Sequence, residues 1–302
     1  AILTEVALPV WPGNNVAPVD DQTNFVPIAT MMAFSSSLIP VSVRAILPKV
    51  FGYYTHWINL QPDLLPPNTK ILNIVVDNFG IPSVATQYAL LAPTIGAVCM
   101  FGDYTPTLTA VTQSIYSGFS IPHMTTTSSS ILSNKLLYPT LSRTVSTSIA
   151  ECDMILSMAQ GWGWTELTII SSGNTFGTET ASSMDTEAAN YGITIANHLT
   201  MSTDTTQFDA QLTELWKKKP QIIVLLISEN IFEMLGSMYR TGYKPAAVVT
   251  DILAAVNVTS YAELGGLPAD FFEGWVSLHT PLGSGQAWND FLTNATIEAM
   301  NN

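Results

Sequence analysis

Six consecutive hydroxyl side chains occupy residues 125–130, with the sequence Thr-Thr-Thr-Ser-Ser-Ser. They directly follow residues 121–124, a short segment that we predict to be a strand. Hydroxyl groups and the free backbone N–H groups at a helix start can hold an anionic group without a fixed positive charge. Thr127, Ser128 and Ser129 are therefore candidate ligand-binding residues. The same hydroxyls could instead cap helices and close turns, as Ser and Thr commonly do.

Two further candidates follow the predicted strand at residues 94–100, in the sequence Gly102-Asp103-Tyr104-Thr105. A helix is expected to begin near Thr105, so its first backbone N–H groups would be available to an anion. Tyr104 and Thr105 therefore join the candidate site.

The second half of the chain places Asn174, Phe176, Glu229 and Asp251 after predicted strands. Phe176 could stack on a ligand or pack in the core. Glu229 and Asp251 could meet a cationic group of a ligand or serve as helix N-caps. Phe176, Glu229 and Asp251 complete the predicted ligand-binding set.

Patterns typical of catalysis are absent from the sequence. The histidines show no metal-type pair at helical spacing, and they are His56, His123, His198 and His279. There is no Gly-x-Ser-x-Gly elbow, no phosphate loop and no Gly-x-Gly-x-x-Gly sequence. We therefore expect a protein that is not an enzyme and that needs neither metal nor cofactor.

The charge balance argues against nucleic acid as a partner. The net charge is −13, and the chain has only ten Lys and Arg residues, whereas phosphate backbones are bound by clustered basic side chains. The one basic run, residues 217–219, precedes Pro220 and fits a solvated helix end. No stretch reaches the roughly 18 uninterrupted apolar residues of a membrane span. We expect contact with a membrane only through a segment outside this chain.

Charged residues make up 11% of the chain, about half the usual share. Ser and Thr replace them, which favours an extracellular or cell-surface protein. Asn257 and Asn294 lie in Asn-x-Thr sequences and are predicted glycosylation sites. Cys99 and Cys152 could form one bridge, but we favour two buried thiols, because Cys99 is predicted in a buried strand and Cys152 in a later helix.

Short apolar runs alternate with amphipathic stretches of helical length along most of the chain. The clearest strands, expected to be central and mostly parallel, are residues 71–77, 94–100, 166–172 and 221–228. Further strands are predicted at residues 27–34, 121–124, 193–201, 246–251 and 274–280, while residues 141–145 are expected to lead away from the first set. Helices are predicted at residues 43–59, 82–91, 105–117, 151–160, 176–190, 206–218, 231–241 and 284–300. Such alternation implies parallel sheets with helices on both faces.

The alternating series runs twice, which predicts two lobes. Residues 1–25 are expected to form an irregular N-terminal arm, residues 26–147 the first lobe and residues 148–302 the second. No Gly- or Pro-rich linker separates the lobes, so we expect a structured hinge between them.

The chain resembles the type I periplasmic-binding-protein family, whose eukaryotic branch includes the ligand-binding regions of natriuretic peptide receptors and class C G-protein-coupled receptors. The resemblance is most specific in one segment, which contains Ile121-Pro122, Thr125 to Ser130, Leu132-Ser133-Asn134-Lys135, Tyr138-Pro139-Thr140 and Arg143-Thr144-Val145. Gly163-Trp164, Thr175-Phe176-Gly177 and Gly274 also occur in the family's order. The resemblance implies two three-layer α/β/α lobes, each with a mainly parallel sheet, and it implies that the two lobes close on a small molecule.

The resemblance also assigns roles to particular positions. In amino-acid-binding relatives, Ser and Thr at the positions of Thr127 and Ser129 hold the ligand's carboxylate, and a Tyr often stands where Phe176 lies. Such relatives carry an acidic residue at the position of Ser148, which pairs with the ligand's ammonium. A hydroxyl cannot compensate a buried ammonium as a carboxylate does, so Ser148 argues against an ordinary α-amino acid as ligand. Relatives also continue further, back into the first lobe, so we expect that return to be missing here.

Two functions from different classes remain open at this stage. The first is an extracellular, receptor-like domain that closes two lobes on a small molecule, with a homo-oligomer as the expected assembly. The second is a structural subunit of an extracellular filament or surface coat that reuses the same fold. A low charge and a Ser- and Thr-rich surface fit both.

Overall fold

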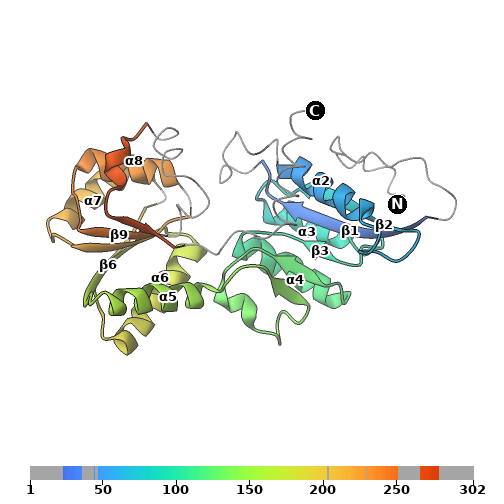
Figure 1. The fold of residues 1–302 in the computed structure, drawn as a ribbon, viewed down its shortest axis with the longest axis horizontal. Helices are drawn as coiled ribbons and strands as arrows, with labels where there is room; N and C mark the ends of the chain where they lie inside the picture. Colours follow the sequence, from blue (N-terminus) through green and yellow to red (C-terminus); the bar gives the residue numbers. More distant parts are fainter. Residues whose placement is uncertain are drawn as a thin grey trace. The chain divides into compact units, whose positions relative to one another are not determined.

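The computed structural model describes residues 23–35, 44, 47–202, 204–228, 230–250 and 266–278. These residues fall into two compact units. Unit 1 contains the described residues up to Thr127, together with Ile131–Thr144. Unit 2 contains Ser128–Ser130 and the described residues from Val145 onward. Figure 1 shows a sheet and its helices in each unit.

Unit 1 is built on a five-stranded sheet in the order β2-β1-β3-β4-β5, in which every neighbouring pair is parallel. Its strands are β1 (Asn24–Met32), β2 (Thr69–Asp77), β3 (Met100–Phe101), β4 (His123–Thr125) and β5 (Leu141–Arg143). Its helices are α2 (Leu47–Leu60), α3 (Pro82–Leu91) and α4 (Pro106–Gly118), and a 3₁₀ turn, η1, covers Ser130–Ser133 at the border of the two units.

The unit 1 helices lie on both faces of the sheet. Val76 of β2 packs in one core cluster with residues of α3 and α4. Asn73 points to the opposite face, because neighbouring strand residues alternate, and its amide donates to Thr55 of α2 at 3.2 Å. The unit therefore has three layers (Figure 1).

Unit 2 repeats this plan with a parallel sheet in the order β10-β9-β8-β6-β7. Its strands are β6 (Glu166–Ser171), β7 (Thr194–Thr200), β8 (Ile222–Leu226), β9 (Ala247–Thr250) and β10 (Trp275–Ser277). Its helices are α5 (Ser148–Gly161), α6 (Thr175–Glu187), α7 (Phe208–Trp216) and α8 (Ile231–Thr241). Short 3₁₀ turns are η2 (Ala188–Tyr191), η3 (Thr205–Gln207) and η5 (Ala269–Phe272).

Strand alternation divides the unit 2 core into two layers. Ile223 and Leu225 of β8 pack with α7 and α8, whereas Val224 and Leu226 pack with α5 and α6. A strand covered on both faces needs apolar residues at every position, which explains the continuous apolar run in the sequence. The predicted α/β fold with parallel sheets is confirmed.

Three sequence expectations are wrong in detail. The strand predicted at residues 94–100 begins only at Met100, because turns centred on Pro93 and Gly96 extend from the end of α3. Cys99 therefore precedes the strand and is half-buried, although both Cys99 and Cys152 are free thiols. The expected central strand β2 lies at the edge of the described sheet. Residues 141–143 do not lead away but join the sheet as β5.

Two predicted elements lie wholly or mostly outside the described residues. They are the N-terminal arm up to residue 22 and the helix at residues 284–300.

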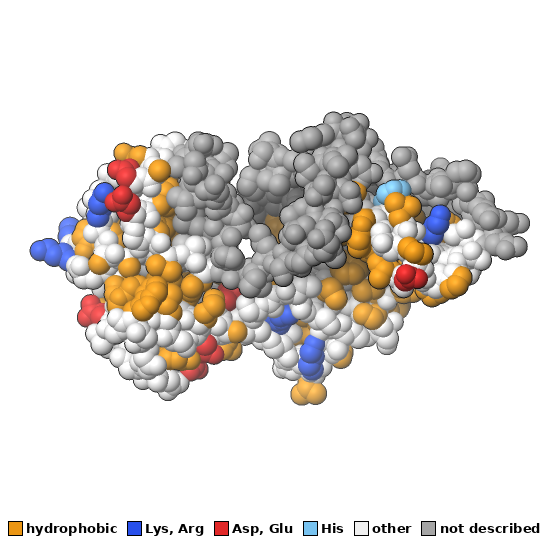
Figure 2. Space-filling model, in the orientation of Figure 1, with side chains coloured by type: hydrophobic (Ala, Val, Ile, Leu, Met, Phe, Trp, Pro, Cys, Tyr) orange, Lys and Arg blue, Asp and Glu red, His pale blue; other side chains and the backbone are white. Residues whose placement is uncertain are grey.

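Charged side chains form only small, scattered groups on the described surface that Figure 2 shows. No helix in the described part of the chain is both long and apolar enough to cross a membrane.

Candidate functional site

The carboxyl ends of the parallel strands bring polar loops together at one edge of each sheet, the usual ligand-binding place in open α/β folds. In unit 1 this edge is formed by the residues that follow β1, β2, β3 and β4. In unit 2 it is formed by the residues that follow β6, β7 and β8. Each edge has its own hydrogen-bond pattern.

In two buried carboxyl groups of unit 1, each oxygen accepts at least one hydrogen bond from the chain. Ser35 donates its N–H, at 3.0 Å, and its hydroxyl to Asp77 Oδ2, while the N–H of Phe79 donates to Asp77 Oδ1 at 2.8 Å. The amide of Asn78 donates to both oxygens of Asp103, at 2.8 and 2.9 Å. Asp77, Asn78 and Asp103 are all buried. These groups hold the three loops against one another.

Asp103 is a carboxyl group without solvent contact. Burial raises its pKa to about 7, the Asn78 hydrogen bond acts in the opposite direction, and the nearby charge of Asp77 raises the pKa further. The preceding Gly102 has a φ of +106°, and a Cβ there would lie 1.8 Å from the carbonyl oxygen of Met31. Only glycine lets this loop pass so close to β1.

His123 of β4 lies beneath the same loops. Its Nε2 donates to the carbonyl of Gly102, and its Nδ1 lies 2.8 Å from Oε1 of Gln113. Burial lowers the pKa of His123 to about 4, against the opposing effect of the Gly102 hydrogen bond. The imidazole connects β4, α4 and the β3 loop.

The candidate residues of unit 1 lie at this edge. Tyr104 is half-buried directly after Asp103. Thr105 stands at the N-cap position of α4 without a capping hydrogen bond, and its buried hydroxyl has no partner among the described residues. Thr127 is buried, its N–H donates to Thr125 at 3.2 Å, and its carbonyl accepts from Arg143 at 3.4 Å.

In unit 2, Asn174 organises the start of α6. Its Oδ1 accepts from the N–H of Gly177 at 3.0 Å and from the hydroxyl of Ser172 at 2.8 Å. Its amide donates to Ser228 after β8 at 2.7 Å. Asn174 is thus an N-cap that also ties two strand-end loops together. Phe176, the second residue of this helix, is half-buried.

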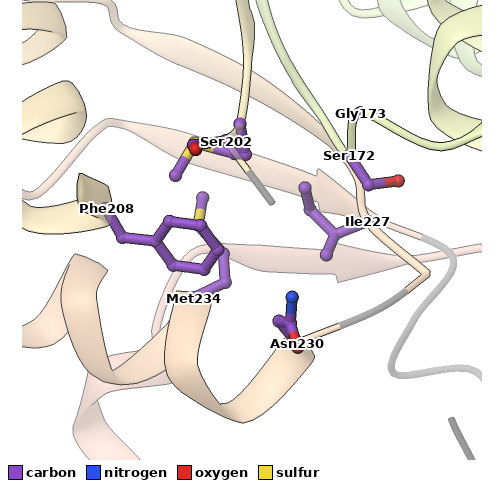
Figure 3. A pocket seen from close by; sticks show the side chains of 8 residues that line it. Ser172, Gly173, Ser202, Phe208, Ile227, Asn230 and Met234 are labelled. Carbon is purple, nitrogen blue, oxygen red and sulfur yellow. The ribbon is translucent and has the colours of Figure 1, made fainter. Parts of the chain in front are cut away.

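A small pocket lies at this edge of unit 2 (Figure 3). It is lined by Ser172, Gly173, Met201, Ser202, Phe208, Ile227, Asn230 and Met234. Its volume of about 10 Å³ is room for about one water molecule. Figure 3 shows the side chains of Phe208 and Met234 close together on one side. This pocket is too small to hold a ligand by itself.

The hydroxyl-rich segment crosses from unit 1 into unit 2. Ser128 is half-buried, and its carbonyl accepts from the N–H of Ser148 at 2.8 Å. Ser129 is buried and donates its hydroxyl to Glu179 Oε2 on α6 at 2.6 Å. Ser128 and Ser129 are thus brought together with α6, the helix that carries Phe176.

Sequence reasoning missed Glu179, because nothing local marks a contact between residues 50 positions apart. Asn78 and His123 were missed as partners of the β3 loop for the same reason. The only available signal for Asn78 was its position after a predicted strand, directly behind Asp77.

Glu229, Asp251, Asn257 and Asn294 lie outside the described residues. Among the residues that are described, no three His, Cys, Asp or Glu side chains lie close enough together to hold a metal ion.

The sequence matches one protein-family model, described as the receptor family ligand binding region, over residues 56–259. The chain belongs to this family. The match includes strands of both units and all eight candidate ligand-binding residues. A search of curated proteins found no match.

Solved structures share the fold of this receptor family ligand binding region. An ABC transporter substrate-binding protein from Desulfitobacterium hafniense has 15% identity and a TM-score of 0.69, with 91% of this chain and 77% of that protein covered. The values are the same for its complex with Leu. An extracellular ligand-binding receptor from Rhodopseudomonas palustris HaA2 has 15% identity and a TM-score of 0.67, with 83% of this chain and 66% of the receptor covered.

Proposed function

We propose that the chain is an extracellular or cell-surface domain that binds a small molecule and has no catalytic activity. The observation that carries the proposal is the match to the receptor family ligand binding region across residues 56–259, on a fold with polar strand-end loops in both units. The solved structures of the same fold include a complex with Leu, so amino acids belong in the library to be tested, although Ser148 stands where amino-acid-binding relatives carry an acidic residue.

The ligand contacts in this proposal are Tyr104, Thr105 and Thr127 from unit 1, and Ser128, Ser129 and Phe176 from unit 2, with Glu229 and Asp251. The unpaired hydroxyl of Thr105 supports a role in binding, because a buried hydroxyl gains free energy from a partner. Binding would shift an equilibrium between open and closed forms.

A thermal-shift screen of the purified chain against a metabolite library tests the proposal, followed by calorimetry on each hit. A ligand at 100 times its Kd adds about 2.7 kcal/mol to the free energy of unfolding, so binders should raise Tm by several degrees. Thr105→Ala should weaken binding of the hit, whereas Thr107→Ala, at the exposed second residue of α4, should not.

Light scattering on the same sample addresses the alternative, a structural subunit. A monomer or dimer with a binding hit supports the ligand-binding role. A polymer that binds nothing from the library contradicts it and favours a filament or coat.

A further inference from the structure

An apolar cavity of about 120 Å³ lies in unit 1, between α3 and the sheet. Its buried lining comes from three neighbouring strands and from the end of α3, and consists of Ala29, Val76, Ala92 and Met100. Half-buried side chains complete the lining, and they are Ile74, Tyr88, Leu91 and Ile95. None of these lining residues carries a charge, and none belongs to the candidate ligand contacts at the strand ends.

The strand register explains where the cavity lies. Ala29 of β1 stands between Ile74 of β2 and Met100 of β3 in one row across the sheet. The methyl group of Ala29 is the shortest of these three side chains, so the row is hollow at its centre. Val76 extends the same surface along β2, because residues two apart on a strand share a face.

Helix α3 covers this row with small side chains. Its buried residues are Ala85 and Ala89, and Ala92 follows at its end. All three belong to one core cluster with residues of the sheet, and five of the eleven buried residues of that cluster are alanine. The unit 2 cluster that packs with α7 and α8 contains no alanine among its fifteen buried residues. Facing layers of short side chains leave a space in unit 1 where the lining atoms lack packing partners.

The size and chemistry of the cavity select its occupant. Apolar cavities of about 150 Å³ stay free of water and bind benzene or xenon. A water molecule inside a protein needs several polar partners, and Tyr88 is the only lining residue with a side-chain hydroxyl. An ion would lose its hydration there without gaining a countercharge. The cavity therefore suits a small uncharged molecule with an apolar body.

The half-buried part of the lining provides a way in. Ile74, Tyr88, Leu91 and Ile95 each keep part of their surface exposed, and β2, which carries Ile74, is an edge strand of the described sheet. A small molecule can therefore reach the cavity by displacing side chains, without separating the strands.

We propose that this cavity is a second binding site of the domain, which takes an uncharged apolar molecule of about the size of benzene. The site goes beyond the proposed function, because its residues line the space between α3 and the sheet and not the strand-end loops. Its occupant makes the contacts that the facing alanines leave unmade.

Matched ring compounds test the chemical class. Benzene and toluene are compared with benzoate and benzylamine, which carry the same ring with a charged group. Each compound is titrated into the whole chain, and Tm is measured by calorimetry at every concentration. We expect benzene and toluene to raise Tm in a saturable way, by about two degrees or more. The two charged compounds should leave Tm unchanged.

Two matched substitutions locate the effect. Ala92→Leu places a longer side chain in the lining of the cavity and should weaken benzene binding at least tenfold. Ala150→Leu makes the same change at an exposed position of α5 and should leave the Kd for benzene unchanged. Unfolding curves show whether both variants fold.

A third variant enlarges the cavity and does not depend on the folding of Ala92→Leu. Ile95→Ala removes part of the half-buried lining. It should still bind benzene and should also bind naphthalene, which we expect the wild type to exclude.

The outcomes decide the proposal in either direction. A saturable rise in Tm that is lost in Ala92→Leu and kept in Ala150→Leu supports the site. An unchanged Tm of the wild type with benzene and toluene overturns it, as does an equal rise with the charged compounds. Equal Kd values in the wild type and Ala92→Leu, or identical ligand preferences in the wild type and Ile95→Ala, also overturn it. The metabolite screen tests the strand-end loops separately, so these outcomes leave the proposed function standing.

Discussion

Buried carboxyl groups of the two units differ in how many of their oxygens accept hydrogen bonds from the chain. In unit 1, both oxygens of Asp77 and both oxygens of Asp103 accept hydrogen bonds from the chain itself. In unit 2, Glu179 has one oxygen bonded to Ser129 and the other buried without a described partner. A buried carboxyl group whose two oxygens both accept hydrogen bonds from the chain stabilises the loops that donate them. The difference assigns a structural role to the carboxyl groups of Asp77 and Asp103.

Glycines at the two edges provide the largest expected effects. Gly102→Ala would place a Cβ 1.8 Å from the carbonyl oxygen of Met31 at a φ of +106°, so backbone must move. We expect a loss of at least about 4 kcal/mol in the free energy of unfolding, measured by urea titration. Gly177→Ala should also destabilise, since its Cβ would lie 2.2 Å from the carbonyl oxygen of Ser172. Gly118→Ala, with open space around it, is the control, and equal stability of all three variants would contradict the account.

Two buried groups of unit 1 should give opposite pH dependences of stability. The pKa of Asp103 is raised to about 7, so between about pH 4 and 7 the folded protein keeps a proton that the unfolded chain loses. Stability therefore falls as pH rises through this window, by up to about 4 kcal/mol. The pKa of His123 is lowered to about 4, so below about pH 6.5 only the unfolded chain binds this proton. Stability then rises with pH, by about 3 kcal/mol.

Single substitutions should separate these opposing contributions. Asp103→Asn removes the contribution that falls with pH, so the stability of this variant should rise more steeply with pH than that of the wild type between about pH 4 and 7. His123→Gln removes the contribution that rises with pH, so the stability of this variant should fall with pH over the same range. Urea unfolding at four pH values across the window measures both slopes. Three parallel profiles would show that neither group titrates as its burial implies.

Loss of the Asn174 cap should have an intermediate effect. Asn174→Ala removes the hydrogen bond to Gly177 and the links to Ser172 and Ser228. We expect a loss of about 1–2 kcal/mol in stability and weaker ligand binding, because α6 carries Phe176, one of the proposed ligand contacts. Asn174→Asp keeps the cap acceptor and should recover most of the stability, and no recovery would contradict a capping role.

The smallest stability effect is expected at Ser148. Its buried hydroxyl has no described partner, so Ser148→Ala should change stability by less than about 0.5 kcal/mol. Thr125→Val in unit 1 removes a buried hydroxyl that donates to the carbonyl of Asp103 and should cost about 1–3 kcal/mol. A large loss at Ser148 would mean that its hydroxyl is already satisfied within the chain.

The sequence predicted strands best where burial on both faces leaves one strong pattern. The apolar run at residues 221–228 became β8 at the centre of its sheet, and Gly192 ends its helical segment with a φ of 71° as a C-cap should. The strand predicted at residues 94–100 was too long. Its β-branched residues favour a strand, but Pro93 and Gly96 form turns there, and this turn signal was given too little weight. The edge position of β2 follows from pairing between distant strands, which local periodicity does not contain.

The candidate site was only partly predictable for the same reason. Strand-end position selected Tyr104, Thr105 and the hydroxyl-rich segment, since this signal is local. The contact between Ser129 and Glu179 joins residues from different elements, and no local pattern marks it. The lobe limits at residues 147 and 148 and the roles of Glu229 and Asp251 stay predictions.

A crystal structure of the domain with its tightest-binding small molecule tests the central claim most directly. The account predicts a hydrogen bond of about 3 Å between the ligand and the hydroxyl of Thr105, with the hydrogen bonds between Asn78 and Asp103 unchanged. A ligand that makes no contact with Thr105, or a domain that binds no small molecule, would contradict it.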